Sequence, residues 1–121
     1  VKYVRLPELL DELALAKLAA DGSYRKLIKK YIKIDVLILD EWLLTNLSPE
    51  ESSSLLEITE ARHKRSSTIY CSQIDTSGWH HKLGNGTIAE AILDRIIHDS
   101  YELLLDGEIS MRERHGLSQR D

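Results

Sequence analysis

Four consecutive apolar residues at positions 36–39 (Val-Leu-Ile-Leu), followed at once by Asp40 and Glu41, constrain the fold more than any other feature of this 121-residue chain. An uninterrupted apolar run of this length is typical of a parallel strand that is buried on both faces. The two carboxylates then stand at the carboxyl end of the strand, where α/β folds place their ligands. The alternative interpretation is a strand that simply ends in solvated acids.

The segments around this strand alternate in type. Ser48, Pro49 and Glu51 form a capping-box pattern that predicts the start of a helix, which ends in the basic residues at positions 62–65. Alternation of strands and helices favours an α/β domain with a largely parallel sheet. The other predicted elements are a second buried strand over 68–71, strands over 1–6 and 101–105, helices over 8–20, 24–32 and 88–98, and a short helix around Trp79.

The composition is that of one globular domain, with 42% hydrophobic and 30% charged residues. A net charge of −4 gives no global positive field, so any binding to nucleic acid needs a local basic cluster. One such cluster follows a face of the 24–32 helix, for which a solvated helix face is the alternative interpretation. Its members are Arg25, Lys26, Lys29, Lys30 and Lys33.

A single cysteine, Cys71, allows no internal disulfide and suits a reducing compartment. No apolar run approaches the roughly 20 residues needed to span a bilayer, and no segment near Val1 has the pattern of a signal peptide. These features predict a cytoplasmic protein without a membrane partner. The histidines complete no metal-ligand set with one cysteine, and Trp42 and Trp79 are expected to pack in the core.

An apolar strand that ends in Asp-Glu is the Walker B arrangement of P-loop ATPases. Asp40 would then hold Mg²⁺ as a hard oxygen ligand, and Glu41 would orient the attacking water. The strand over 68–71 leads into Ser72 and Gln73, which fit by position a sensor between that water and the γ-phosphate. Ordinary loop polarity is the alternative for these two residues.

Two arginines are candidates for sensing phosphate. Arg95 lies on a helix whose other inward positions are apolar, so its charge needs a partner. That partner is either an internal carboxylate or, across a subunit boundary, the γ-phosphate of a neighbour, which an arginine finger grips with its planar fork. Arg112 is the second candidate, with surface solvation as its alternative.

The phosphate-binding loop of P-loop ATPases does not occur in these residues. None of the six glycines is followed by Lys, so the pattern G-x-x-x-x-G-K-[ST] is absent. Without those backbone N–H groups and that lysine, the β- and γ-phosphates have no cradle, and we expect negligible ATP affinity for the chain alone. The chain starts at Val1 in a strand-like segment without an initiator Met, as if it opened in the middle of a fold.

Taken together, these residues resemble the IstB-like ATP-binding proteins, the ATPase helpers encoded beside the transposase in certain bacterial insertion sequences. The family is related to the DnaC-type helicase loaders. The resemblance covers nearly the whole chain and keeps the order and spacing of the family's segments. They are positions 4–10 (VRLPELL), 21–24 (DGSY), 35–42 (DVLILDEW), 65–69 (RSSTI), 72–73 (SQ), 79–80 (WH), 91–96 (AILDRI), 107–108 (GE) and 110–112 (SMR).

The resemblance implies a P-loop NTPase fold of the AAA+ type, with three layers and a largely parallel sheet that lacks the N-terminal phosphate-loop strand. Residues 1–121 would be the C-terminal portion of a single AAA+ ATPase domain. The resemblance also implies ATP and Mg²⁺ as cofactors of the intact parent, and a transposase, DNA and further copies of the chain as partners. The missing strand would leave exposed sheet edges, which favour self-association or poor stability.

By the same resemblance, Asp40 and Glu41 match Walker B, and Ser72 with Gln73 matches the first sensor region. Arg95 matches the arginine-finger position and Arg112 the second sensor. Ile109 departs from the family pattern, because many relatives run directly from Gly-Glu into Ser-Met-Arg. Two other functions stay open: a non-catalytic interaction module and a replicative helicase loader.

Overall fold

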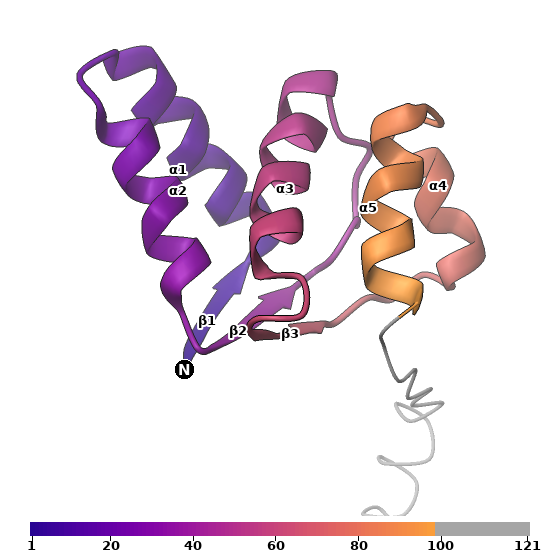
Figure 1. Cartoon of the computed structure of the whole chain (residues 1–121). Helices are drawn as coiled ribbons and strands as arrows, with labels where there is room; N and C mark the ends of the chain where they lie inside the picture. The colour runs from indigo at the N-terminus through magenta and orange to yellow at the C-terminus, as the bar shows by residue number, and fades with distance from the viewer. Residues whose placement is uncertain (99–121) are drawn as a thin grey trace, which may run out of the picture.

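The apolar run at positions 36–39 forms the middle strand of a parallel sheet. The computed structural model describes residues 1–98, and both neighbouring strands run parallel to the middle one, with Arg5 opposite Asp40 and Ile69 opposite Ile38. The predicted α/β fold with a parallel sheet is therefore confirmed (Figure 1). In spatial order the strands are β1 (Lys2–Arg5), β2 (Val36–Asp40) and β3 (Ser67–Tyr70).

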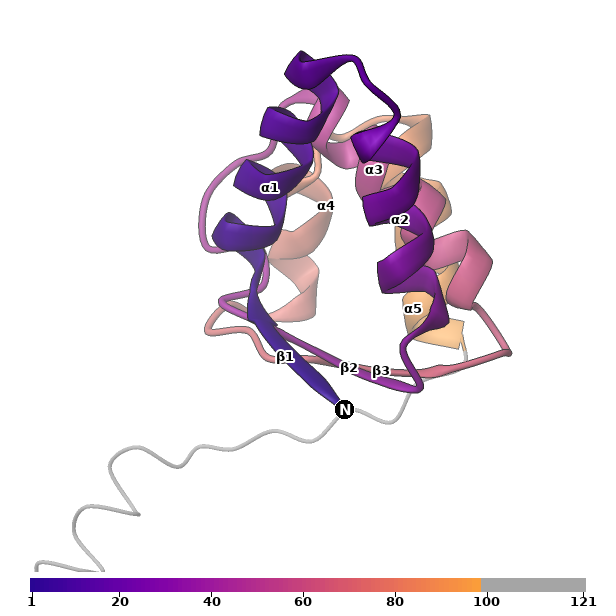
Figure 2. The same cartoon turned by 90° about the vertical axis from the view of Figure 1, so that its left-hand side faces the viewer.

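The helices of residues 1–98 all lie on one face of this sheet, as two perpendicular views show (Figures 1 and 2). Their ends lie within two residues of the sequence predictions, and none is long and apolar enough to cross a bilayer. The predicted strand over 101–105 and Arg112 lie outside the described residues. The helices are α1 (Leu6–Ala19), α2 (Ser23–Lys33), α3 (Pro49–Arg62), α4 (Trp79–Lys82), preceded by the short η1 (Thr76–Gly78), and α5 (Thr87–His98).

The core forms between the helices and the covered face of the sheet. Leu37 and Leu39 of β2 point into it and are almost fully buried, at 0% and 3% exposure, whereas Val36 and Ile38 on the other face are half-buried. The prediction that β2 is buried on both faces is therefore wrong for residues 1–98. An apolar run makes a strand compatible with burial on both faces. Whether one face or both are buried depends on which helices pack against the sheet.

Strand β3 is likewise less buried than its sequence predicts. Ser67 and Ile69 are exposed, Ile69 by 49% of its surface, and among the described strands β3 pairs only with β2. The prediction of a second buried strand is wrong here because β3 is an edge strand of the sheet in residues 1–98. An edge strand presents unpaired N–H and C=O groups along its open side.

Local signals fix the start of α3. Ser48 Oγ accepts a hydrogen bond from the backbone N–H of Glu51 at 3.2 Å, and Glu51 Oε1 accepts one from the backbone N–H of Ser48 at 2.8 Å. Pro49 occupies the first turn, where a missing N–H costs nothing. The predicted capping box is confirmed, and such a cap stabilises a helix by about 1 kcal/mol.

Two tryptophans pack beneath the carboxyl edge of the sheet, as predicted. Trp42 is fully buried directly after β2, and its ring meets Tyr70 edge-on with centroids 4.7 Å apart. Trp79 packs against Trp42 at 5.9 Å from the α4 side. These contacts hold the segments that follow β2 and β3 together at the edge that carries the acids.

A buried arginine ties down the opposite, amino edge of the sheet. Arg62, only 2% exposed at the end of α3, donates to groups at the end of α2 and the start of β3. Burial lowers the pKa of its guanidinium. The acceptors are the carbonyl oxygens of Tyr31 (2.8 Å), Ile32 (3.3 Å), Ile34 (2.5 Å) and Ser67 (2.6 Å) and the hydroxyl of Thr68 (2.9 Å).

Candidate functional site

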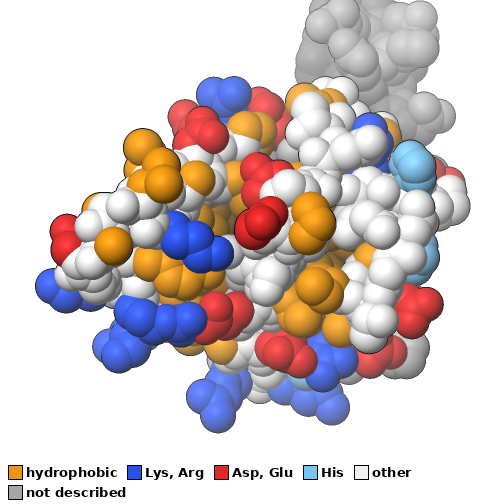
Figure 3. All heavy atoms as spheres, turned by 90° about the horizontal axis from the view of Figure 1, so that it is seen from above, with side chains coloured by type: hydrophobic (Ala, Val, Ile, Leu, Met, Phe, Trp, Pro, Cys, Tyr) orange, Lys and Arg blue, Asp and Glu red, His pale blue; other side chains and the backbone are white. Residues whose placement is uncertain are grey.

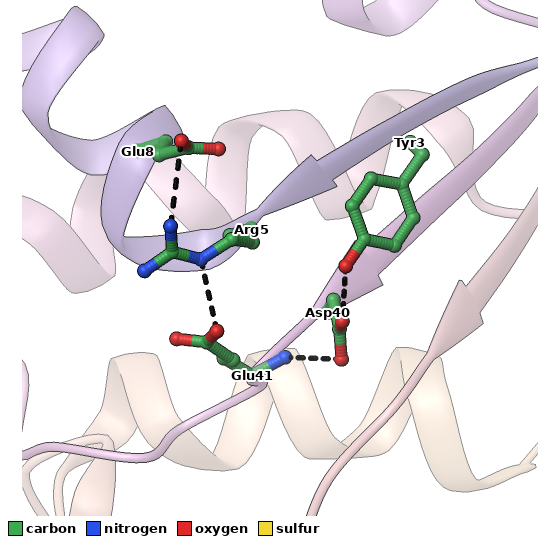
Figure 4. A network of polar contacts seen from close by, with 5 residues as sticks. All are labelled: Tyr3, Arg5, Glu8, Asp40 and Glu41. Atoms are coloured by element: carbon green, nitrogen blue, oxygen red, sulfur yellow. Dashed lines mark hydrogen bonds and ion pairs between the residues drawn. The ribbon is translucent and has the colours of Figure 1, made fainter.

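Asp40 and Glu41 stand at the carboxyl edge of the sheet, Asp40 as the last residue of the middle strand and Glu41 directly after it (Figure 4). Asp40 Oδ2 accepts a hydrogen bond from the hydroxyl of Tyr3, and its Oδ1 accepts one from the backbone N–H of Glu41 at 2.8 Å. Both bonds favour the ionised carboxylate, so they lower the pKa of Asp40, and the bond from Tyr3 contributes most. Asp40 is therefore a charged carboxylate whose orientation is set from two sides.

Arg5, the last residue of β1, orients the second acid. Its Nε donates to Glu41 Oε2 at 2.9 Å, and its Nη1 lies 3.5 Å from Glu8 Oε2. The side chains of Arg5 and Glu41 are 46% and 32% exposed, so solvent screens the pair and it adds little to the stability of the fold. The contact matters for where the Glu41 carboxylate points more than for stability.

The backbone turns abruptly at the second acid. Glu41 has φ of +55°, in the left-handed region that costs a non-glycine residue roughly 1–2 kcal/mol. Leu43 follows with φ of +56°. This turn sends Trp42 into the core while Glu41 stays at the surface beside Arg5. The fold thus holds a strained backbone at the acid-bearing edge, a feature common at functional sites.

Ser72 and Gln73 follow β3 at the same edge, as predicted, but they differ in their surroundings. The hydroxyl of Ser72 lies 3.0 Å from the carbonyl oxygen of Trp42, and it accepts a hydrogen bond from the backbone N–H of Ile74 at 3.2 Å. Ser72 therefore links the loops that follow β2 and β3. Gln73 is exposed, so of the two it has the side chain that can reach a bound ligand directly.

Arg95 lies on α5 and takes carboxylate partners within its own chain. Its Nη2 lies 3.1 Å from Glu60 Oε2 on α3, and its Nη1 lies 3.4 Å from the neighbouring Asp94. The internal ion pair weighed from the sequence is thus present. Its side chain is 32% exposed, so Arg95 also remains within reach of solvent.

Tyr3 and Arg5 are the residues that sequence reasoning missed. Both lie on β1, about 36 positions before the acids they contact. The available signal was the parallel pairing itself. Once β1 and β2 are predicted to be neighbours in a parallel sheet, the polar residues near the end of β1 must meet those at the end of β2.

We call the carboxyl end of β2, with Asp40 and Glu41, the acid edge. Its carboxylates suit a divalent cation that is also bound by a phosphate. Mg²⁺ takes one or two protein carboxylates and completes its shell with water and phosphate oxygens. Asp40 supplies a carboxylate that is charged and held in place. Within residues 1–98 no three His, Cys, Asp or Glu side chains gather closely enough to hold a metal ion by themselves.

The whole sequence was compared with models of known protein families. The family model described as "IstB-like ATP binding protein" matches residues 1–119. The chain belongs to this IstB-like family. The fold resemblance drawn from the strand order and the acid pair is thereby confirmed, and the parallel α/β unit described above is that of an IstB-like P-loop NTPase.

Curated relatives align along most of the chain. "Putative insertion sequence ATP-binding protein y4pL" of Sinorhizobium fredii is 43% identical over 94% of the chain and 46% of the relative. "Putative insertion sequence ATP-binding protein y4uH" of the same organism is 39% identical over 94% of the chain and 45% of the relative. "Insertion sequence IS232 putative ATP-binding protein" of Bacillus thuringiensis is 25% identical over 98% and 47%. The chain spans about half the length of these relatives.

Proposed function

We propose that this chain carries the acidic half of an ATP site in an insertion-sequence helper protein that works with a transposase. The observation that carries the proposal is the position of Asp40 and Glu41 at the carboxyl edge of the middle parallel strand. We infer ATP as the ligand because the relatives are named as insertion sequence ATP-binding proteins. In this proposal residues 1–121 are the C-terminal portion of one AAA+ ATPase domain, and activity belongs to the whole domain.

The two acids have different roles in the proposed site. Asp40 holds Mg²⁺, which offsets the charge that develops on the phosphate oxygens. Glu41 orients the attacking water. Arg5 occupies Glu41 Oε2, which leaves Oε1 to accept a hydrogen bond from that water. Tyr3 keeps Asp40 ionised and fixed, so the metal ligand needs no rearrangement of β2.

The remaining candidates act on the γ-phosphate. Gln73, with Ser72 fixing its loop, is the proposed first sensor, and Arg112 the proposed second sensor. Arg95 is the proposed arginine finger of a homo-oligomer and would exchange Glu60 for a neighbour's phosphate. Because the exposed pair is worth only about 0–1 kcal/mol, this exchange costs little.

The proposed setting is the cytoplasm, where a helper on DNA meets its transposase and where the single Cys71 stays reduced. The names of the relatives favour an insertion sequence over a replicative helicase loader. The non-catalytic module stays as the second candidate, because none of the six glycines of this chain is followed by Lys.

The test is a chimera in which residues 1–119 replace the matching segment of y4pL, so that the relative supplies the rest of the protein. We expect the chimera to bind and hydrolyse Mg–ATP, and the chain alone to give no saturable binding in titration calorimetry. Asp40→Asn in the chimera should remove the Mg²⁺ dependence of ATP binding, and Asp11→Asn, an exposed acid on α1, should not. ATP binding whose Mg²⁺ dependence survives Asp40→Asn would overturn the proposal.

A further inference from the structure

The charges of this acidic chain are strongly segregated. Helix α2 (Ser23–Lys33) carries five cations and no acid, whereas eleven cations and all twenty acids lie elsewhere, a net charge of −9. The space-filling view shows Lys and Arg side chains gathered on the α1–α2 side of the molecule (Figure 3). Segregation on this scale makes a local positive surface on a protein whose overall charge is −4.

Four of the α2 cations form one line, which we call the α2 lysine stripe: Lys26, Lys29, Lys30 and Lys33. Their spacing of three, one and three residues keeps them on one side of a helix and spreads them over about 10 Å of its length. The opposite side holds Ile28 and Tyr31, both at 0% exposure in the core. All four lysines are exposed, so the stripe faces solvent along its whole length.

Within residues 1–98 no carboxylate forms an ion pair with the stripe, and Lys30 Nζ lies 5.8 Å from the centroid of the Tyr31 ring. The fifth cation, Arg25, forms an ion pair with Glu57 of α3, and with Lys17 it lies over the ring of Tyr24. Four like charges on one helix face repel one another, so a polyanion that neutralises them lowers the free energy of this face when it binds.

The chemistry of the stripe selects the kind of polyanion. Lysines contact phosphates as point charges, and the stripe has no Arg, Asn or Gln that could read a base edge. It also has no exposed aromatic ring on which an unpaired base could stack. The apolar side of α2 is buried against the core, so the helix cannot insert into a lipid surface. These features fit the backbone of a DNA duplex, independent of sequence.

We infer that the α2 lysine stripe is a duplex-DNA surface of this chain, which contacts backbone phosphates without sequence preference. The inference rests on the proposed function for its choice of DNA and adds the contact surface. Lys33 lies just before the amino end of β2, whereas Asp40 lies at the carboxyl end, so the DNA and the acid edge use opposite ends of the sheet. Both can therefore be occupied at once.

The experiment measures binding of the full 121-residue chain to a short fluorescent duplex by anisotropy over a range of salt concentrations. Lys29→Gln with Lys33→Gln should weaken binding about 10- to 100-fold at about 50 mM salt and reduce the slope of log K against log[salt] by about 2. The matched control, Lys64→Gln with Lys82→Gln, makes the same change in net charge outside the stripe and should leave both quantities close to those of the wild type. Circular dichroism checks that each variant is folded.

Three outcomes would overturn the inference: no duplex binding by the wild type at low salt, equal weakening by the stripe and control pairs, or stronger binding to anionic vesicles than to duplex. The stripe test measures duplex binding by lysine variants, whereas the ATP test measures ATP binding by the chimera. Failure of one test is therefore distinguishable from failure of the other.

Discussion

Arg5 Nε and Glu41 Oε2 lie 2.9 Å apart, although 36 positions separate the two residues in the chain. The contact exists because β1 and β2 are parallel neighbours in a register that sets Arg5 opposite Asp40. Together with the bond from Tyr3 to Asp40, it means that β1 orients both acids that end β2 (Figure 4). Two strands therefore form the acid edge: β2 supplies the acids, and β1 supplies the side chains that orient them.

Replacing Tyr3 by Phe should raise the pKa of Asp40 toward its usual value, because the hydroxyl is the largest contributor to its lowered pKa. The measurement is a pH titration of the Asp40 carboxyl carbon by NMR. Tyr24→Phe, which removes the Tyr24–Ser54 hydrogen bond, is the matched control and should leave the Asp40 titration in place. An Asp40 pKa that does not move in Tyr3→Phe would show that the hydroxyl does not hold the carboxylate.

The hydrogen bond from Tyr3 to Asp40 should also make the stability of the fold depend on pH. The folded-state pKa of Asp40 is lowered, so its contribution to stability is present above the unfolded-state pKa of about 3.9 and is lost as pH falls through the folded-state value. The stability difference between wild type and Tyr3→Phe should therefore be constant near neutral pH and shrink below about pH 4.

Glycine at position 41 should relieve the left-handed backbone. Glu41→Gly and Glu41→Ala both remove the carboxylate, but only glycine adopts φ of +55° without strain. We expect the glycine variant to be more stable than the alanine variant by about 1 kcal/mol in urea denaturation. Equal stability, or a more stable alanine variant, would argue against a strained turn at the acid edge.

Arg62→Met should be the most destabilising of these substitutions, by about 3–5 kcal/mol, because it leaves buried carbonyl oxygens at the end of α2 without a donor. The exposed Arg65, three residues on, is the control, and Arg65→Met should change stability by less than about 0.5 kcal/mol. Similar losses in the two variants would mean that the hydrogen bonds of Arg62 contribute little.

Much of the fold follows from local patterns. The capping box at Ser48, the buried side of α2 and the strand that ends in Asp40 are each specified by a few neighbouring residues, and the structure contains all three. The extent of burial of β2 and β3 cannot be predicted in this way, because the sequence of a strand does not determine whether another element packs on its second face. Ile38 and Ile69 have the apolar character of core residues yet lie on the open side.

Some residues of the candidate site could likewise be predicted from the sequence, and others could not. Asp40 and Glu41 could be placed from the sequence because they are adjacent and follow a strong strand signal. Tyr3 and Arg5 could not, because their importance arises from strand pairing, which brings together residues far apart in the chain. The partner of Arg95 also needed the structure, since the packing of α3 on α5 brings Glu60 within 3.1 Å.

The central claim, that Glu41 orients the attacking water at an ATP site, is tested most directly by ATP hydrolysis in the y4pL chimera with Glu41→Gln. We expect hydrolysis to fall by at least about 100-fold while Mg–ATP binding is kept, because glutamine retains the shape of glutamate but not its charge. Glu50→Gln, an exposed acid in the first turn of α3, should hydrolyse ATP at the parent rate. Hydrolysis by the Glu41→Gln chimera at the parent rate would contradict the account.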